Sequence, residues 1–203
     1  MQPRSTITQG RILDAAVTAL VEYGYAGAST LRIQEIAEVS RGRLLHHFPS
    51  RDDLLIAAVQ HLASARVDAT AEGVRWPTDP KKRIAAAIEA MWSTYQQDYF
   101  WAATELWMGA RHNDQLRAVL ATEERRLYQK VRAATDSMFG TPLVEHPAYT
   151  DVREFVNTSM RGVALTYSFD RRPHDRDPHR RLWKTYATSV LLAPGDAAGA
   201  DSR

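Results

Sequence analysis

Residues 30–54 restrict the fold of this chain more than any other stretch of its sequence. Their apolar side chains first recur at intervals of three and four, which is typical of one face of a helix. Ser40 is a candidate N-cap for a second helix over residues 41–48, and Pro49 ends that helix, because the residue before a proline is pushed out of the helical region. With Thr30 as the candidate N-cap of the first helix, the stretch predicts two short helices joined by a tight turn.

The second of these short helices carries four basic side chains, Arg41, Arg43, His46 and His47. A helix-turn-helix places its second helix in the major groove of DNA, with its first residues at the base edges. Arginine suits this position because one guanidinium can donate to two acceptors of the same guanine. A buried helical hairpin with a solvated basic face would give the same pattern, so the residues leave both interpretations open.

A longer set of residues extends the pattern in both directions. Its members, in order, are residues 12–16 (Ile-Leu-Asp-Ala-Ala), Gly24-Tyr25, Ser29-Thr30, Ile33, Ala37, residues 39–42 (Val-Ser-Arg-Gly), Leu44, residues 47–51 (His-Phe-Pro-Ser-Arg) and Leu54. In this order and spacing, residues 8–62 resemble the DNA-binding domain of the TetR (tetracycline-repressor-like) family of transcriptional regulators.

The resemblance implies an all-α chain of about nine helices, with an N-terminal three-helix, homeodomain-like helix-turn-helix domain and a C-terminal helical bundle. Base-edge or groove contacts are expected of Arg41, Arg43 and His46. The other polar members of the site would contact phosphate or hold the helix-turn-helix in place. The full set of expected DNA-binding residues is Thr30, Arg32, Ser40, Arg41, Arg43, Leu44, His46, His47 and Arg51.

Three residues depart from the family pattern. Gln34 stands where the family has alanine, Glu38 where it has a turn glycine that is often left-handed, and Leu45 where it has a tyrosine that touches phosphate. A carboxylate at Glu38 would also repel a nearby phosphate. These residues favour an alternative function, a helical small-molecule-binding protein of the same fold that has lost operator binding.

Helical spacing predicts seven further helices, at residues 9–23, 52–66, 81–100, 101–111, 115–139, 149–169 and 179–192. Ser50 with Asp53 fits a capping box, and Asp79-Pro80 and Asp177-Pro178 each fit an N-cap followed by a first-turn proline. The expected domains are a helix-turn-helix domain at residues 1–66 with a loose arm over residues 1–8, a ligand-binding and dimerisation domain at 67–194, and a disordered tail at 195–203.

Aromatic and methionine side chains gather between residues 91 and 108. They suit either the core of a helical bundle or a pocket between helices for a mostly apolar or aromatic effector. The family resemblance favours the pocket, because its members typically bind small effectors in the C-terminal domain. The candidate ligand-binding residues are Met91, Trp92, Tyr95, Trp101, Glu105, Met108, His112 and Phe155.

The resemblance also implies a homodimer held together by the helices at residues 149–169 and 179–192. Two helix-turn-helix motifs held about one DNA turn apart, roughly 34 Å, recognise a palindromic operator and combine their affinities. Alternatively, these helices only close the core of the monomer. The expected function is a transcriptional regulator, most often a repressor in this family, that a small molecule releases from double-stranded DNA.

Composition agrees with a DNA-binding protein of modest charge. The net charge of +2 equals the excess of six arginines over four acids within residues 1–51. The absence of cysteine excludes disulfides and thiolate metal sites, and there is neither a glycine-rich phosphate loop nor a G-x-S-x-G motif. We therefore expect no catalytic residue, metal or cofactor, and we expect a cytoplasmic protein without a membrane span.

Overall fold

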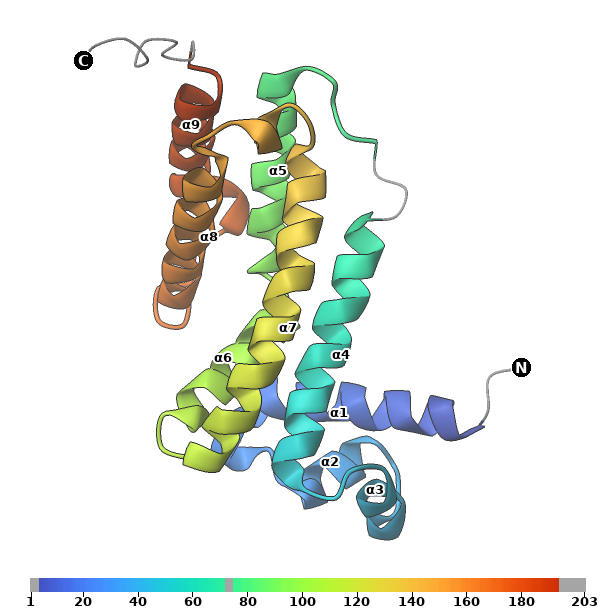
Figure 1. Ribbon diagram of the computed structural model, residues 1–203. Coiled ribbons are helices and arrows are strands. Elements are labelled where there is room, and N and C mark those ends of the chain that lie inside the picture. Colours follow the sequence, from blue (N-terminus) through green and yellow to red (C-terminus); the bar gives the residue numbers. More distant parts are fainter. Residues whose placement is uncertain (1–3, 72–74, 194–203) are drawn as a thin grey trace, which may run out of the picture. The chain divides into compact units, whose positions relative to one another are not determined.

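The computed structural model describes residues 4–71 and 75–193, and all regular secondary structure in those ranges is helical (Figure 1). The helices are α1 (Arg4–Gly27), α2 (Thr30–Ile36), α3 (Arg41–His47), α4 (Arg51–Ala71), α5 (Pro80–Thr94), α6 (Asp98–Ala110), α7 (Asp114–Phe139), α8 (Tyr149–Thr166) and α9 (His179–Leu191), with 3-10 helices η1 (Leu143–Glu145) and η2 (His174–Arg176). The nine α-helices of the described ranges confirm the predicted all-α fold. None of the described helices is long and apolar enough to cross a membrane.

The backbone packs as two compact units. The first unit comprises residues 1–73 and 97–134, and the second comprises residues 74–96 and 135–203. Helix α6 and most of α7 therefore pack with the N-terminal helices. The predicted functional boundary between residues 66 and 67 concerns DNA and ligand binding and stays a prediction.

The core of the first unit forms where α1 packs against α4 and α6. Figure 1 shows α1 running across α4, with α2 and α3 beside the start of α4. Ile12 and Leu20 of α1, Ile33 of α2, Leu44 of α3 and Leu54 of α4 are almost completely buried in this core. Each such side chain contributes about 1.5–3 kcal/mol when it leaves water, so the core fixes α2 and α3 against α1 and α4.

In the second unit, aromatic rings from several helices surround Trp92 of α5. Its ring centroid lies 5.0 Å from that of Trp183 on α9, 6.0 Å from Tyr167 and 6.2 Å from Tyr95. Arg180 of α9 also forms an ion pair with Glu89 of α5, at 2.8 Å. The aromatic side chains of this unit therefore form its core, as the first of the two interpretations predicted for Trp92.

A buried carboxylate joins the loop before α9 to the end of α8. Asp177 accepts hydrogen bonds from the hydroxyl of Tyr167 at 2.6 Å and from the backbone N–H of His179 at 2.8 Å. Burial alone would raise the pKa of Asp177, but these bonds lower it below its ordinary value. Burial and the bond to Asp177 raise the pKa of Tyr167 to about 12. Asp177 was predicted as the N-cap of α9. This was wrong by one position, because Pro178 is the residue that directly precedes the helix.

The structure corrects the predicted helix over residues 81–100. Helix α5 ends at Thr94 because the N–H groups of Tyr95 and Gln96 bond to carbonyls three residues back, which tightens the last turn. Gln97 is then extended, and α6 starts at Asp98. The hydroxyl of Tyr95 donates to the side chain of Asn157 at 2.6 Å and fixes this break to α8.

Other helix ends differ from the predictions in simpler ways. Helix α1 begins at Arg4, so most of the predicted arm over residues 1–8 is helical, and α4 continues to Ala71 instead of ending near residue 66. Two predicted caps are confirmed, the capping box of Ser50 with Asp53 and the N-cap Asp79. The predicted tail at 195–203 lies outside the described residues.

Candidate nucleic-acid interface

Two serines cap the short helices of the reader, which we define as α2, α3 and the turn between them. The hydroxyl of Ser29 accepts from the N–H of Arg32 at 3.2 Å, and that of Ser40 accepts from the N–H of Arg43 at 3.4 Å. The prediction for Ser40 is confirmed. The prediction that Thr30 caps α2 was wrong, because Ser29 does so and Thr30 is the first helical residue.

The turn between α2 and α3 depends on a left-handed residue. Glu38 has a φ of 51°, in the left-handed region that favours glycine. Arg11 of α1 supports this turn by donating to the carbonyl oxygen of Ala37 at 2.6 Å and to the carboxylate of Glu38 at 3.3 Å. The turn is therefore held from outside, by a side chain of α1, rather than by a glycine within it.

Three N-terminal arginines make contacts inside the first unit. Besides Arg11, Arg32 donates to the carbonyl oxygen of Gly27 at 2.7 Å, and its guanidinium lies 4.0 Å from the centre of the Tyr23 ring. Arg51 donates to the carbonyl oxygen of Ala28 at 2.8 Å. These side chains hold the reader in place, which was one of the two roles expected of Arg32 and Arg51.

Two other arginines make no such contacts with the described residues. The side chains of Arg41 and Arg43, on α3, are exposed and make no hydrogen bond or ion pair to any residue that the structure describes. His46 is exposed on the same helix. His47 is half-buried, and its ring centroid lies 6.3 Å from that of Phe48. The structure thus separates the basic residues of this region into anchors and free donors, and both free arginines lie on the second helix of the reader.

Leu44 and Leu45 have opposite surroundings on α3. The side chain of Leu44 is 1% exposed and belongs to the core of the first unit, whereas Leu45 is 41% exposed. Leu44 was predicted as a DNA-binding residue, and its burial instead assigns it to packing the helix. Ser40 and Thr30 remain near the reader surface as exposed and half-buried residues, respectively.

A hydrogen-bonded network centred on Tyr25 joins the end of α1 to α4, α6 and the start of α7. The Tyr25 hydroxyl donates to the carboxylate of Asp52 at 2.9 Å and accepts from Asn113 at 3.2 Å. Its backbone N–H, left free where Gly24 interrupts α1, donates to Glu105 at 3.0 Å. Gly24 has a φ of 67°, which glycine adopts without strain.

The same tyrosine is held on its two faces by other residues. The guanidinium of Arg51 lies 4.4 Å from the centre of the Tyr25 ring and also donates to the Tyr25 carbonyl oxygen. A methyl group added to Gly109 of α6 would come within 2.5 Å of the ring, so only glycine permits this approach. Sequence reasoning did not find this network, because its members are far apart in the chain and only their helix caps carry a local signal.

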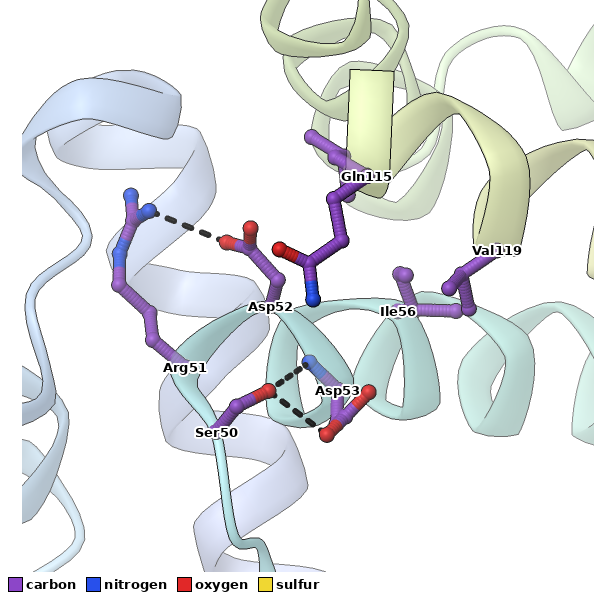
Figure 2. Close-up of a pocket in the computed structure, with 8 residues that line it drawn as sticks. Ser50, Arg51, Asp52, Asp53, Ile56, Gln115 and Val119 are labelled. Carbon is purple, nitrogen blue, oxygen red and sulfur yellow. Dashed lines mark hydrogen bonds and ion pairs between the residues drawn. The ribbon is translucent and has the colours of Figure 1, made fainter. Parts of the chain in front are cut away.

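A pocket of about 360 Å³ lies between the starts of α4 and α7 (Figure 2). Its polar side is formed by the first residues of α4, and its apolar side by Ile56, Leu116 and Val119. The carboxylates of Asp52 and Asp53 at its rim already accept bonds from protein groups, among them Arg51 and Ser50 in Figure 2. None of the eight predicted ligand-binding residues lines this pocket.

The predicted ligand-binding residues are divided between the two units. Met91, Trp92, Tyr95 and Phe155 belong to the second unit, whereas Trp101, Glu105, Met108 and His112 belong to the first. The first three are buried, but Phe155 is 56% exposed. Met108 and His112 are also exposed, and Glu105 is bonded to the backbone of Tyr25.

Comparison with known proteins agrees with this geometry. Residues 12–58 match the family of bacterial regulatory proteins described as the tetR family. The HTH-type transcriptional regulator BetI of Paraburkholderia xenovorans (strain LB400) is 27% identical over 132 residues, which cover 63% of this chain and 67% of that protein. The HTH-type transcriptional activator FasR of Mycolicibacterium smegmatis is 32% identical over 90 residues, which cover 44% of this chain and 41% of FasR.

Solved structures extend the likeness over nearly the whole chain. The transcriptional regulator FadR from Bacillus subtilis, solved in complex with stearoyl-CoA, matches with a TM-score of 0.63 at 17% sequence identity, covering 90% of this chain and 97% of FadR. At this identity the match shows the fold.

The helix-turn-helix and the all-α fold define a DNA-binding transcriptional regulator. Residues 12–58, which carry the helix-turn-helix, are thus similar to bacterial regulatory proteins of the tetR family, and the relatives BetI and FasR are transcriptional regulators.

Proposed function

We propose that this chain is a homodimeric repressor that binds a palindromic operator and is released from it by a small molecule. The observation that supports operator binding best is the contrast among its arginines. Arg41 and Arg43 are exposed on α3 and unpaired among the described residues, while Arg32 and Arg51 are bonded to backbone carbonyls. A free guanidinium keeps all its donors for the base edges, which a guanidinium already bonded inside the protein does not.

In this proposal Arg41, Arg43 and His46 read bases in the major groove. Ser40, Thr30 and His47 lie near the phosphates of the same site, and Arg32 and Arg51 hold the reader in position. Phosphate contacts fix the register of a protein on DNA, whereas base contacts select its sequence. Among these polar residues, only Arg41, Arg43 and His46 are therefore expected to change sequence preference when they are replaced.

The homodimer is supported by an apolar face on α8 and α9. Phe155 of α8 and Tyr186 of α9 have ring centroids 4.8 Å apart, and both side chains are exposed, as is Leu182 one turn before Tyr186. The opposite face of α9 is buried through Trp183 and Ala187. A helix that is apolar on both faces suits a second packing partner, and we propose that this partner is another copy of the chain.

The proposed effector is a small, mostly apolar or aromatic molecule. FadR from Bacillus subtilis was solved with stearoyl-CoA, a ligand with a long apolar chain, which is in keeping with a mostly apolar effector here. Whatever its identity, the effector can shift the protein between two arrangements only by its difference in affinity for them. We propose that it favours an arrangement in which the two readers no longer match the roughly 34 Å spacing of successive major grooves.

Selection of bound fragments from random-sequence DNA tests the proposal directly. A palindrome is the expected result, and Arg43→Ala should then weaken binding to that operator by about 1–3 kcal/mol in a mobility-shift titration. The free energy of unfolding should change by less than about 0.5 kcal/mol, since the side chain is exposed and unpaired.

Arg125→Ala is the matched control, because it removes the same charge from an exposed position on α7. It should leave operator affinity within experimental error. Equal affinity of Arg43→Ala and the wild type would remove Arg43 from the site. If no sequence is enriched at all, the alternative of a helical small-molecule-binding protein is favoured.

A further inference from the structure

The exposed face of α3 follows from its two inward-facing residues. Successive residues of an α-helix are rotated by about 100°, so seven residues make roughly two turns. Leu44 is buried and His47 is half-buried, which defines the inner side of the helix. Gly42 and His46 then lie at the centre of the opposite side, with Arg43 on one edge and Leu45 on the other.

Leu45 is an apolar residue on this otherwise polar face. The core does not require it, because its neighbour Leu44 supplies the packing of α3. An isolated exposed leucine is ordinary on most protein surfaces. Here, however, it lies on the helix that carries the two free arginines, Arg41 being one turn before it. If α3 enters the major groove as proposed, this position lies beside the DNA.

We propose that Leu45 is a specificity-determining residue that recognises the methyl group of a thymine in the major groove. This inference rests on the proposed operator binding. Among the four bases, thymine alone presents a C5 methyl group there, and aliphatic or aromatic side chains contact it without needing a hydrogen bond.

Replacing thymine by uracil removes this methyl group and nothing else from the groove. The test uses the operator obtained by selection, with each dT replaced in turn by dU in both half-sites, and measures affinity by fluorescence anisotropy. Wild-type protein should lose about four-fold in affinity per half-site at one position, the value expected when one buried apolar carbon contributes about 0.8 kcal/mol. The Leu45→Ala variant should bind the dT and dU operators equally.

Leu31→Ala provides a matched control, since Leu31 is a 60% exposed leucine on α2. This variant should keep the wild-type preference for dT. Thermal unfolding of Leu45→Ala should match that of the wild type, which shows that any loss of preference does not come from unfolding.

Three results would overturn the inference. Wild-type protein that binds dT and dU operators equally at every position, while still selecting a palindrome, would refute it and leave the proposed function intact. A Leu45→Ala variant that weakens both operators equally and keeps the four-fold difference would assign the methyl contact to another residue. Failure to select any sequence would overturn the inference together with the proposed function.

Discussion

Glu38 pays a conformational penalty that a glycine would avoid. Its φ of 51° lies in the left-handed region, where an L-residue with a side chain is less stable by roughly 1–2 kcal/mol. Its ion pair with Arg11 offsets little of this, because both side chains are largely exposed and such pairs contribute about 0–1 kcal/mol.

We therefore expect Glu38→Gly to stabilise the protein. The gain should be about 0.5–1 kcal/mol, since the relief of strain is partly offset by the greater freedom of glycine in the unfolded chain. Urea unfolding followed by circular dichroism measures it.

Glu38→Gln separates conformation from charge, because it removes the charge and keeps the side chain. Its stability should stay close to that of the wild type. If Glu38→Gly and Glu38→Gln change the free energy of unfolding by the same amount, the left-handed conformation is not the source of the change.

At the residue scale, the sequence predicted the kinds of interaction better than the residues that make them. An N-cap was expected at the start of α2, but Ser29 and Thr30 are adjacent and both can cap a helix, and only the backbone decides between them. Leu44 and Leu45 pose the same difficulty, because a seven-residue helix is too short for its spacing to identify the buried leucine.

Among the elements, the start of α4 is bonded to the end of α1 by Arg51. Its guanidinium donates to the carbonyl oxygens of Tyr25 and Ala28 and pairs with the carboxylate of Asp52 at 3.2 Å. Ala28 is completely buried, so its carbonyl would lose this partner without ready access to water.

Arg51→Ala should therefore lower the free energy of unfolding by about 2–3 kcal/mol, in line with the loss of hydrogen bonds from a charged donor. The salt dependence of DNA binding should hardly change, because the residue is proposed to anchor the reader and not to contact phosphate. Chemical denaturation and binding at several salt concentrations measure the two effects.

The Arg51→Lys variant keeps the charge but loses the planar fork that reaches two carbonyls at once. It should recover only part of the lost stability. A salt slope shallower by about one in Arg51→Ala, with normal stability, would instead show that Arg51 neutralises a phosphate.

Helix boundaries were predictable where a side chain or a proline sets them. Asp79-Pro80 and the capping box at Ser50 were read from the sequence and are present. The break between α5 and α6 was predicted after residue 100 but follows Thr94, and no proline or glycine marks it in the sequence. It depends on Tyr95 reaching Asn157 of α8, a contact between residues 62 positions apart.

At the scale of the whole molecule, the proposed dimer depends on the apolar face formed by Phe155, Leu182 and Tyr186. Leu182 is 53% exposed, and a charge at its position would have to be buried in a dimer without a partner. Leu182→Glu should therefore give a monomer in sedimentation velocity. Operator affinity should fall by at least about 100-fold, because linked binding of two readers is lost.

A second exposed apolar residue provides the comparison. Val131→Glu places the same charge on α7, outside this face, and should leave the sedimentation coefficient and operator affinity unchanged. A dimer that persists in Leu182→Glu would contradict the proposed interface and leave the reader itself unaffected.

The fold was predictable over the whole chain because helical spacing and family pattern agree. The ligand-binding residues were not, since a pocket is made by residues from separate elements and composition alone does not show which aromatics converge. Trp92 illustrates this, for its neighbours Tyr167 and Trp183 come from the last third of the chain, and they make it part of a packed core.

Tyr25 occupies a position from which α6 and α4 cannot slide independently. It bonds to Glu105 of α6 through its backbone and to Asp52 of α4 through its hydroxyl, and its ring rests directly on Gly109. Because the phenol ring is rigid, a displacement of one helix is passed to the other through it. Any shift of α6 within the first unit must therefore either move the start of α4 with it or break the hydrogen bonds of Tyr25.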